Sequence, residues 1–242
     1  MRWERWMWDD IRAAFSFLTI LPLGFAEGRK PGWSVAWYPL VGILIGLLLV
    51  AIHSISPLDA SLTAFVMLLA WVIITGGLHL DGFADSCDAL LATVSVERRL
   101  DIMKDPRTGS WAVIGLAVLL LGKWVFLQTV TVAYLLLAPI LGRWLMSIAV
   151  LTLPYARNQG LGSYFRNGAG WREIIIATSI TLIAIWWLNA WWVAFCVLII
   201  AIVLIRWAMQ RLGGGITGDV YGALCEICEV LCLLGGVLWV SN

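Results

Sequence analysis

Apolar runs long enough to cross a lipid bilayer constrain this chain more than any other feature. Hydrophobic residues make up 62% of it and charged residues only 13%, roughly half the share usual in soluble domains. A membrane-spanning helix needs about 20 mostly apolar residues, so we expect about seven such helices. The expected spans cover roughly residues 35–55, 60–78, 111–131, 134–152, 173–188, 191–209 and 220–240. The sixteen tryptophans are typical of the aromatic belts at the two membrane surfaces.

The sequence therefore predicts an all-α, polytopic integral membrane bundle in which residues 1–242 form a single membrane-embedded domain. Residues 1–26 combine arginines and tryptophans with two aspartates ahead of a short apolar run. Those acids, and the lack of a small-residue cleavage site, argue against a removed signal peptide. We expect an N-terminal interfacial or re-entrant helix instead. Gly42 and Gly46 are four residues apart, which predicts close packing between two helices.

Basic residues fall on one side of the predicted bundle. They concentrate in the polar intervals 79–109 and 154–173 and at Arg206 and Arg211, whereas the turns expected on the opposite side contain no Lys or Arg. Because basic loops stay in the cytoplasm, we expect a multi-pass protein of the cell's inner membrane. The polar loops and their short helices would then face the cytoplasm, together with any active site that they form.

Three aspartates follow the second predicted span, in the stretch from Thr75 to Asp88. If this stretch is helical, Asp81, Asp85 and Asp88 fall within about 60° of one another on a single face. Carboxylates that close repel one another unless a cation lies among them. Hard oxygen ligands favour Mg²⁺ or Mn²⁺, so the pattern predicts a metal site. The alternative is a solvated acidic helix face at a membrane boundary, although His79 and the neighbouring glycines are not what such a face requires.

Two polar intervals supply further candidate binding residues. In the first, Pro106 should end a short helix, so that Asp105, Arg107 and the backbone around Gly109 face a shared pocket. The second interval combines Arg157 and Arg166 with several glycines, which allow its backbone to approach a ligand closely. Both intervals are expected on the same membrane face as the aspartates.

Two basic residues, Lys123 and Arg143, lie inside apolar spans, where each costs about 2.5–3.5 kcal/mol and should find an anion. Glu226 and Glu229 in the last span are natural partners for a structural ion pair. Alternatively, Lys123 or Arg143 contacts a phosphate, and Glu226, which shares a helix face with Asp219, joins the metal cluster. The sequence leaves these alternatives open. The five cysteines are expected to be packed thiols without disulfides.

Several of these motifs together resemble a known family, cobalamin synthase, also called adenosylcobinamide-GDP ribazoletransferase. The motifs that carry the resemblance are Gly76-Gly-Leu-His-Leu-Asp-Gly-Phe-Ala-Asp-Ser-Cys-Asp88, Met103-Lys-Asp-Pro-Arg-Thr-Gly109, Gly142-Arg-Trp144 and Gly214-Gly-Ile-Thr-Gly-Asp219. With the early segment Phe17-Leu-Thr-Ile-Leu-Pro22, the resemblance covers nearly the whole chain. The chain departs from the family pattern at Ile20 and Ala89. Neither position is an expected metal ligand.

The resemblance implies a membrane-embedded catalytic domain that completes the nucleotide loop of cobalamin, vitamin B12. Such enzymes join adenosylcobinamide-GDP to α-ribazole or α-ribazole 5′-phosphate, release GMP and require Mg²⁺. The expected partners are these two substrates, membrane lipid, and either a second copy of the chain or other corrinoid-assembly enzymes, but no nucleic acid. A ribazole hydroxyl would attack the phosphorus next to the cobinamide.

The resemblance also suggests a role for each candidate residue. Phosphoryl transfer depends on positioning and on charge neutralisation. The expected metal ligands are Asp81, Asp85, Asp88 and Glu226, and the expected catalytic residues are Asp81, Asp85, His79 and Arg107. His79 would act as the general base or would orient an aspartate. The expected substrate-binding residues are Lys104, Asp105, Gly109, Arg143, Arg157, Arg166, Thr217 and Asp219.

Two other classes are compatible with parts of the pattern. CDP-alcohol phosphotransferases also place aspartates around an Asp-Gly step on a membrane helix, but the sequence after Asp81-Gly82 lacks their Ala-Arg continuation. A transporter with Lys123, Arg143 and Glu226 along an ion path is the second alternative. The one-sided distribution of polar groups and the absence of a recognisable internal repeat argue against it.

Overall fold

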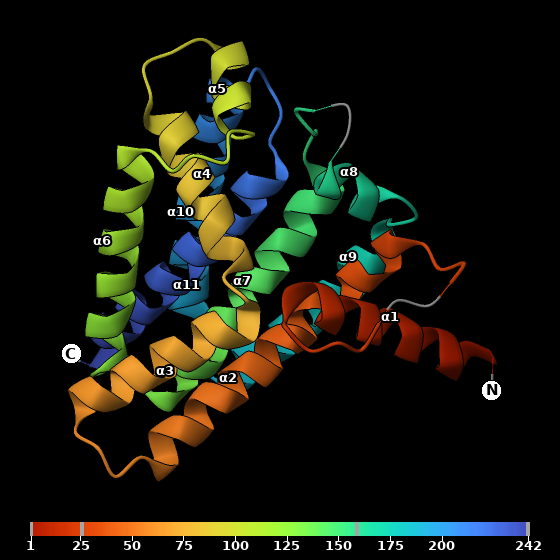
Figure 1. The fold of residues 1–242 in the computed structure, drawn as a ribbon. Coiled ribbons are helices and arrows are strands. Elements are labelled where there is room, and N and C mark those ends of the chain that lie inside the picture. Colours follow the sequence, from red (N-terminus) through yellow and green to blue (C-terminus); the bar gives the residue numbers. More distant parts are fainter. Residues whose placement is uncertain (1, 25–26, 158–159, 241–242) are drawn as a thin grey trace.

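The structure, a computed structural model, describes residues 2–24, 27–157 and 160–240, and these residues form helices without β-strands (Figure 1). This confirms the predicted all-α fold. In chain order the helices are α1 (Arg2–Leu18), the 3-10 helix η1 (Pro31–Trp37), α2 (Tyr38–Ile55), α3 (Ala60–Thr75), α4 (Leu78–Leu91), α5 (Val96–Ile102), α6 (Ser110–Leu127), α7 (Val132–Thr152), α8 (Leu161–Arg166), α9 (Trp171–Trp187), α10 (Trp191–Arg211) and α11 (Gly218–Val240).

The described residues contain 5 helices that are long and apolar enough to cross a membrane, or 6 spans if one bent pair is counted. The five are Pro31–Ile55, Ser110–Leu127, Val132–Thr152, Trp191–Arg211 and Gly218–Trp239. The predicted multi-pass bundle is therefore confirmed, whereas the predicted count of seven is not. One expected span corresponds to α9, which has only 17 residues, and another is interrupted between α3 and α4.

A pair of glycines causes that interruption. Gly76 and Gly77 have φ angles of 60° and 68°, in the left-handed region that side chains other than glycine rarely adopt. α3 ends at Thr75, and α4 leaves it at an angle of 91°. The expected straight span over residues 60–78 is therefore wrong in its last turn. The bend turns the aspartate-bearing helix away from the axis of α3.

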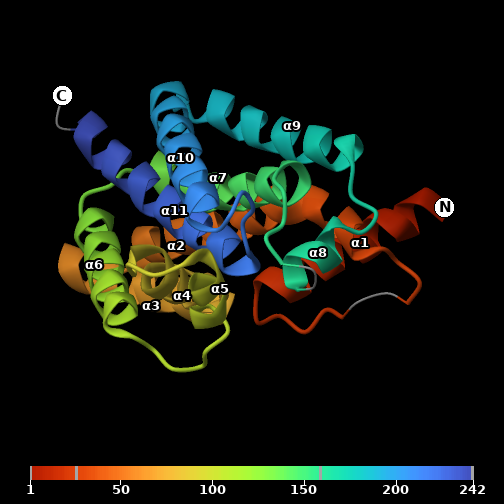
Figure 2. The same cartoon turned by 90° about the horizontal axis from the view of Figure 1, so that it is seen from above.

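The centre of the bundle is α7, which packs against α2 and α11 (Figure 2). Two glycines on α2 permit the first of these contacts. A Cβ atom on Gly42 would lie 2.5 Å from the carbonyl oxygen of Pro139, and one on Gly46 would lie 2.8 Å from Cα of Leu136. Only helices whose backbones touch leave so little space. The close packing predicted for Gly42 and Gly46 is confirmed.

The N-terminal helix α1 runs across the other helices instead of alongside them (Figure 1). Its inner face buries Ala14 and Leu18, whereas Trp8 is exposed. Asp10 forms an ion pair with Arg29, which ties the helix to the segment before η1. The sequence is right about a separate amphipathic helix here, and its location at the membrane surface stays a prediction.

One end of the bundle collects the polar connections: α5, α8 and the link between α10 and α11 lie together there (Figure 1). Two backbone hydrogen bonds link the extended residues after α7 to those before α11. The amide of Ala156 donates to the carbonyl of Ile216 at 2.9 Å, and the amide of Ile216 donates to that of Pro154 at 3.0 Å. These bonds fix the loop after α7 against the residues that lead into α11.

Candidate active site

The candidate site begins where α4 and α11 touch. A Cβ atom on Gly82 would lie 2.8 Å from the carbonyl oxygen of Asp219, and one on Gly222 would lie 3.2 Å from that of His79. The two backbones are therefore in direct contact at these glycines. This contact brings Asp81, next to Gly82, close to Asp219, although the two are far apart in the sequence.

A cavity of about 200 Å³ opens beside this contact. Its polar wall contains His79, Asp81, Arg157 and Asp219, which come from α4, from the loop after α7 and from α11. The cavity therefore combines candidates from three separate sequence motifs. Asp105, Arg107 and Gly109, which were expected to face a shared pocket, are not among the residues that line this cavity.

Four carboxylates of α4 and α11 interact electrostatically, and two of them, Asp81 and Asp219, line the cavity. Asp85 experiences the negative charges of Asp219, Asp81 and Asp88 and the positive charge of Arg157. The guanidinium of Arg157 lies 3.2 Å from the carboxylate of Asp219. One guanidinium among four carboxylates leaves an excess of negative charge, which attracts a further cation.

Asp219 is held in place by its neighbours as well as by its helix. The hydroxyl of Thr217 donates to the Asp219 carboxylate at 3.2 Å, and Thr217 itself is fully buried. The same hydroxyl lies 3.4 Å from the sulfur of Met103, in the first polar interval. The hydroxyl therefore orients Asp219, and the expected binding of substrate by Thr217 stays a prediction.

Asp88 has a different environment from the other aspartates. One of its carboxylate oxygens accepts from the amide of Gly109 at 2.6 Å, and the other accepts from that of Ala112 at 2.9 Å. These amides belong to the start of α6, where a carboxylate satisfies unpaired donors and complements the helix dipole. Asp88 therefore caps α6 in this structure, and Gly109 contributes to that cap.

Within the described residues, no group of three or more His, Cys, Asp or Glu side chains is arranged to hold a metal ion. The predicted three-aspartate ligand set is therefore not assembled, since Asp88 is bound to α6. Mg²⁺, however, is usually held by one or two carboxylates together with substrate phosphates and water. The carboxylates of Asp81 and Asp219, which both line the cavity, suit that mode, whereas Asp85 is not among the lining residues.

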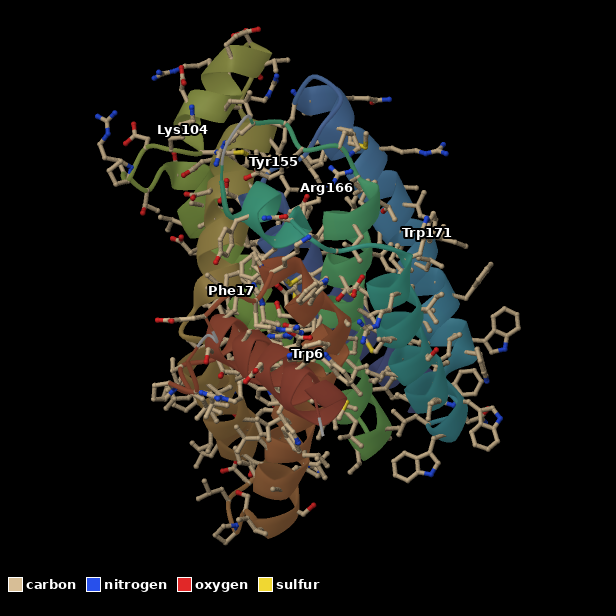
Figure 3. The ribbon with its side chains drawn as sticks, turned by 90° about the vertical axis from the view of Figure 1, so that its right-hand side faces the viewer. Trp6, Phe17, Lys104, Tyr155, Arg166 and Trp171 are labelled. Carbon is tan, nitrogen blue, oxygen red and sulfur yellow. The ribbon has the colours of Figure 1, made fainter. Side chains whose placement is uncertain are left out.

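The loop that contains Lys104 and Arg107 lies outside the cavity lining. The Arg107 guanidinium binds Asp105 in the same loop at 2.6 Å, and its side chain is 84% exposed. This hydrogen-bonded pair lowers the pKa of Asp105 to about 2. Lys104 is exposed at the outer edge of the loop end (Figure 3). Asp105, Lys104 and Arg107 do not reach the aspartates in this structure.

Arg166, the second arginine of the later interval, is exposed and donates to the carbonyl of Leu153 at 2.9 Å. It is absent from the residues that line the cavity. Arg157 is therefore the arginine that the fold brings to the carboxylates. Sequence reasoning gave both arginines equal weight, because the glycine-rich interval does not show which of them turns inward.

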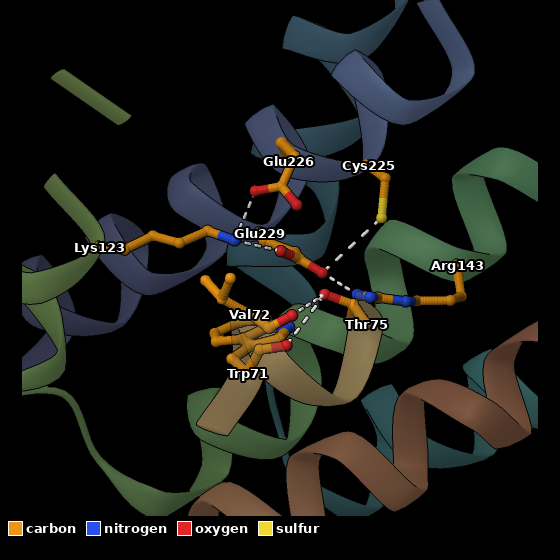
Figure 4. Close-up of polar contacts among 8 residues, drawn as sticks. All are labelled: Trp71, Val72, Thr75, Lys123, Arg143, Cys225, Glu226 and Glu229. Atoms are coloured by element: carbon orange, nitrogen blue, oxygen red, sulfur yellow. Dashed lines mark hydrogen bonds and ion pairs between the residues drawn. The ribbon is translucent and has the colours of Figure 1, made fainter. Parts of the chain in front are cut away.

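The intramembrane charges form a separate network (Figure 4), and its residues are not among those that line the cavity. Lys123 binds Glu226 at 2.7 Å and also binds Glu229, while Arg143 forms an ion pair with Glu229. All four side chains are at most 5% exposed. The ammonium of Lys123 also lies 4.2 Å from the ring centre of Trp71.

This network corrects two expectations. Glu226 does not join the aspartates as a metal ligand, because its carboxylate faces Lys123. Arg143 does not face the cavity as a phosphate-binding residue, because its guanidinium is completely buried against Glu229. The structure supports the other alternative, a structural cluster of paired charges. The expectation of unpaired thiols is confirmed, since all five cysteines are free.

Sequence reasoning missed the aromatic lining of the cavity. The cavity is also lined by Phe17, Tyr38, Tyr155, Phe165 and Tyr221. These residues come from five different segments of the chain. Because most of the chain is apolar, no single aromatic residue stands out in the sequence as a cavity residue. The one usable signal was that Tyr155 and Phe165 lie within the glycine-rich polar interval.

The fold and the site define a class: an all-helical, multi-pass membrane protein with a polar cavity built from carboxylates of two helices and one arginine. The family model of cobalamin-5-phosphate synthase matches residues 10–237 of the chain. The chain therefore belongs to this family, as the sequence motifs indicated.

Curated relatives agree with this assignment. A protein of Pseudomonas putida (strain GB-1), called adenosylcobinamide-GDP ribazoletransferase, is 41% identical over 92% of this chain and 95% of its own length. A protein of Desulforamulus reducens with the same name is 38% identical over 95% of this chain and 98% of its own length. No solved structure matches the chain. These matches give no support to the phosphotransferase or transporter alternatives.

Proposed function

We propose that this chain joins adenosylcobinamide-GDP to α-ribazole, or to α-ribazole 5′-phosphate, and releases GMP. Adenosylcobalamin, or its 5′-phosphate, is the other product, and the reaction completes the nucleotide loop. The names of the relatives support this activity. The observation that carries it is the contact of α4 with α11, which places Asp81, Asp219 and Arg157 in one cavity.

The reaction follows from the chemistry of the two substrates. A ribose hydroxyl oxygen of the ribazole forms a bond to the phosphorus next to the cobinamide. The bond from that phosphorus to the GMP oxygen breaks, so GMP leaves with its own phosphate and the hydroxyl proton passes to a base. Such a transfer requires neutralised charge and in-line positioning. The polar wall of the cavity supplies groups for both.

Arg157 is the residue that we assign to the diphosphate. Its Nη2 lies 3.2 Å from the Asp219 carboxylate, and its Nε has no hydrogen-bond acceptor within the described residues. A planar guanidinium with spare donors can bind two phosphate oxygens at once. Asp81 and Asp219 would hold Mg²⁺ together with the substrate phosphates, and the bound ion would neutralise charge on the diphosphate.

His79 remains the candidate for moving the hydroxyl proton. It lines the cavity and is only 2% exposed, and its Nε2 has no hydrogen-bond partner among the described residues. An unpartnered ring nitrogen can accept a proton from a hydroxyl that enters the cavity. In the alternative role, the same nitrogen orients a carboxylate.

The loop end of the bundle, which contains the cavity, would face the cytoplasm of a cell whose inner membrane the protein spans. This assignment rests on the basic residues that collect at that end, among them Arg98, Lys104, Arg107 and Arg211. Both substrates are soluble molecules, and this orientation gives them direct access. Assembly with a second copy or with other corrinoid-assembly enzymes stays an expectation from the sequence.

Removal of divalent cations tests the metal part of the proposal. Purified protein in lipid should lose turnover by about 100-fold or more in the presence of a chelator, because negative charge on the diphosphate is then poorly neutralised. Added Mg²⁺ or Mn²⁺ should restore it. The measurement is the rate of GMP release, followed by chromatography. Full activity in chelator, with metal content verified by mass spectrometry, would exclude a required cation.

A further inference from the structure

The cavity beside α4 and α11 has two chemically different walls. Asp81, Asp219 and Arg157 form a charged wall, and the function proposed above uses only this wall. The rest of the lining is apolar and largely aromatic, and it includes Met146 and Val150 of α7. A diphosphate and a metal ion need no such surface. The aromatic wall therefore requires a ligand group of its own.

Three rings from distant segments pack together in this wall. The ring centres of Phe17 and Phe165 are 4.1 Å apart, and Tyr38 is edge-on to Phe165 at 6.4 Å. Tyr38 is 1% exposed and Phe165 is 3% exposed, so both are fixed by packing. Figure 3 shows Phe17 on α1. A planar ligand would meet a preformed apolar surface here.

Two further rings, those of Tyr155 and Tyr221, also line the cavity. Tyr155 and Tyr221 are stacked, with ring centres 6.4 Å apart and planes inclined by 27°. The space beside them depends on a glycine, since a Cβ atom on Gly162 would lie 2.3 Å from the Tyr155 ring and 2.8 Å from the Tyr221 ring. Tyr221 and Asp219 both belong to α11, and both line the cavity.

We infer that this aromatic wall, made of Phe17, Tyr38, Phe165, Tyr155 and Tyr221, binds the planar base of α-ribazole. The inference rests on the proposed function. With its dimethylbenzimidazole base against the aromatic wall, the attached ribose extends toward Asp81 and Asp219 on the charged wall. The aromatic wall thus determines which acceptor base is bound, whereas the residues of the charged wall act in the phosphoryl transfer.

The size of the cavity favours the ribazole base over the larger parts of the other substrate. At about 200 Å³ it is smaller than the roughly 300–1,000 Å³ of pockets for drug-sized ligands. It suits one flat bicyclic base and excludes a corrin ring. The corrinoid must therefore remain outside this cavity, with only its phosphate chain close to the charged wall.

Polarity decides between the two flat bases, dimethylbenzimidazole and guanine. The edge of guanine has several hydrogen-bond donors and acceptors, and burying them unpaired among Phe17, Phe165, Met146 and Val150 would cost free energy. In α-ribazole one ring nitrogen of dimethylbenzimidazole is bonded to the ribose, so the base has two methyl groups, one acceptor nitrogen and no N–H donor. An apolar wall therefore favours the acceptor base and disfavours the guanine of the leaving group.

Steady-state kinetics of a Phe165→Leu variant tests the inference. Leucine preserves apolar bulk but removes the flat ring, so KM for α-ribazole should rise about tenfold or more, as expected for a lost stacking platform. KM for adenosylcobinamide-GDP should change less than about twofold, because its binding groups lie elsewhere. The matched control is Phe195→Leu on α10, an exposed residue outside the cavity, which should change neither KM.

A second measurement uses the unaltered protein, so it does not depend on the folding of a variant. Free dimethylbenzimidazole should inhibit competitively against α-ribazole and not against adenosylcobinamide-GDP, whereas guanine should not compete with α-ribazole. Two results would overturn the inference while leaving the proposed function intact. One is competition of free dimethylbenzimidazole with adenosylcobinamide-GDP, and the other is a Phe165→Leu variant in which only the KM for adenosylcobinamide-GDP rises. Absence of any GMP release by folded protein would instead refute the proposed function.

Discussion

Replacing Asp81 with asparagine should lower turnover by about 100- to 1,000-fold, the range seen when one group that stabilises transition-state charge is removed. Asparagine preserves the size of the side chain but removes its negative charge, and with it a ligand for a hard cation. Asp81 is exposed at the cavity, so the protein should still fold. The measurement is GMP release at saturating substrates, together with Mn²⁺ binding followed by electron paramagnetic resonance.

The matched control is Asp101→Asn. Asp101 is an exposed aspartate of α5 at the same end of the bundle, outside the cavity lining, and its replacement should leave turnover and Mn²⁺ binding unchanged. Asp219→Asn should resemble Asp81→Asn, because both carboxylates line the same cavity. Turnover of Asp81→Asn within a factor of about two of the wild-type rate would refute the assigned role.

Replacing Lys123 with methionine should destabilise the bundle by about 3–5 kcal/mol, the usual cost of removing one partner from a buried ion pair. The change leaves the carboxylates of Glu226 and Glu229 inside the bundle with Arg143 as the single remaining cation of the network. The measurement is unfolding by denaturant in mixed detergent micelles, followed by tryptophan fluorescence.

A double variant separates the effect of the lost charge on stability from the effect of the changed side-chain shape. Lys123→Met combined with Glu226→Gln removes one charge of each sign, so it should recover part of the lost stability. Stability equal to wild type in the single variant would mean that the paired charges do not stabilise the helices. The cluster would then need another role. Loss of stability without recovery in the double variant would indicate a packing defect instead.

The sequence predicted most of what depends on local pattern. The apolar runs predicted a helical membrane bundle, and the spacing of Gly42 and Gly46 predicted a helix contact that the structure shows against Pro139 and Leu136. Composition could not show that Gly76 and Gly77 bend the second run, because the run remains apolar across them. Hydropathy thus detected the apolar residues but missed the change of direction.

The candidate site was only partly predictable, because it depends on contacts between distant segments. Asp81 meets Asp219 through Gly82, and no pattern in either motif shows this. Glu226 shares a helix face with Asp219, but seven residues along a helix rise by about 10 Å, which takes its carboxylate to Lys123. Arg107 looked like a phosphate ligand from its motif, yet its nearest anion is Asp105.

The central claim is that the chain joins its two substrates in one displacement. The most direct test incubates the purified protein in lipid vesicles with adenosylcobinamide-GDP and Mg²⁺, with and without α-ribazole, and quantifies GMP and the joined corrinoid. The account predicts equal amounts of both products, formed only when α-ribazole is present. Release of GMP without α-ribazole, or no product from folded protein, would contradict it.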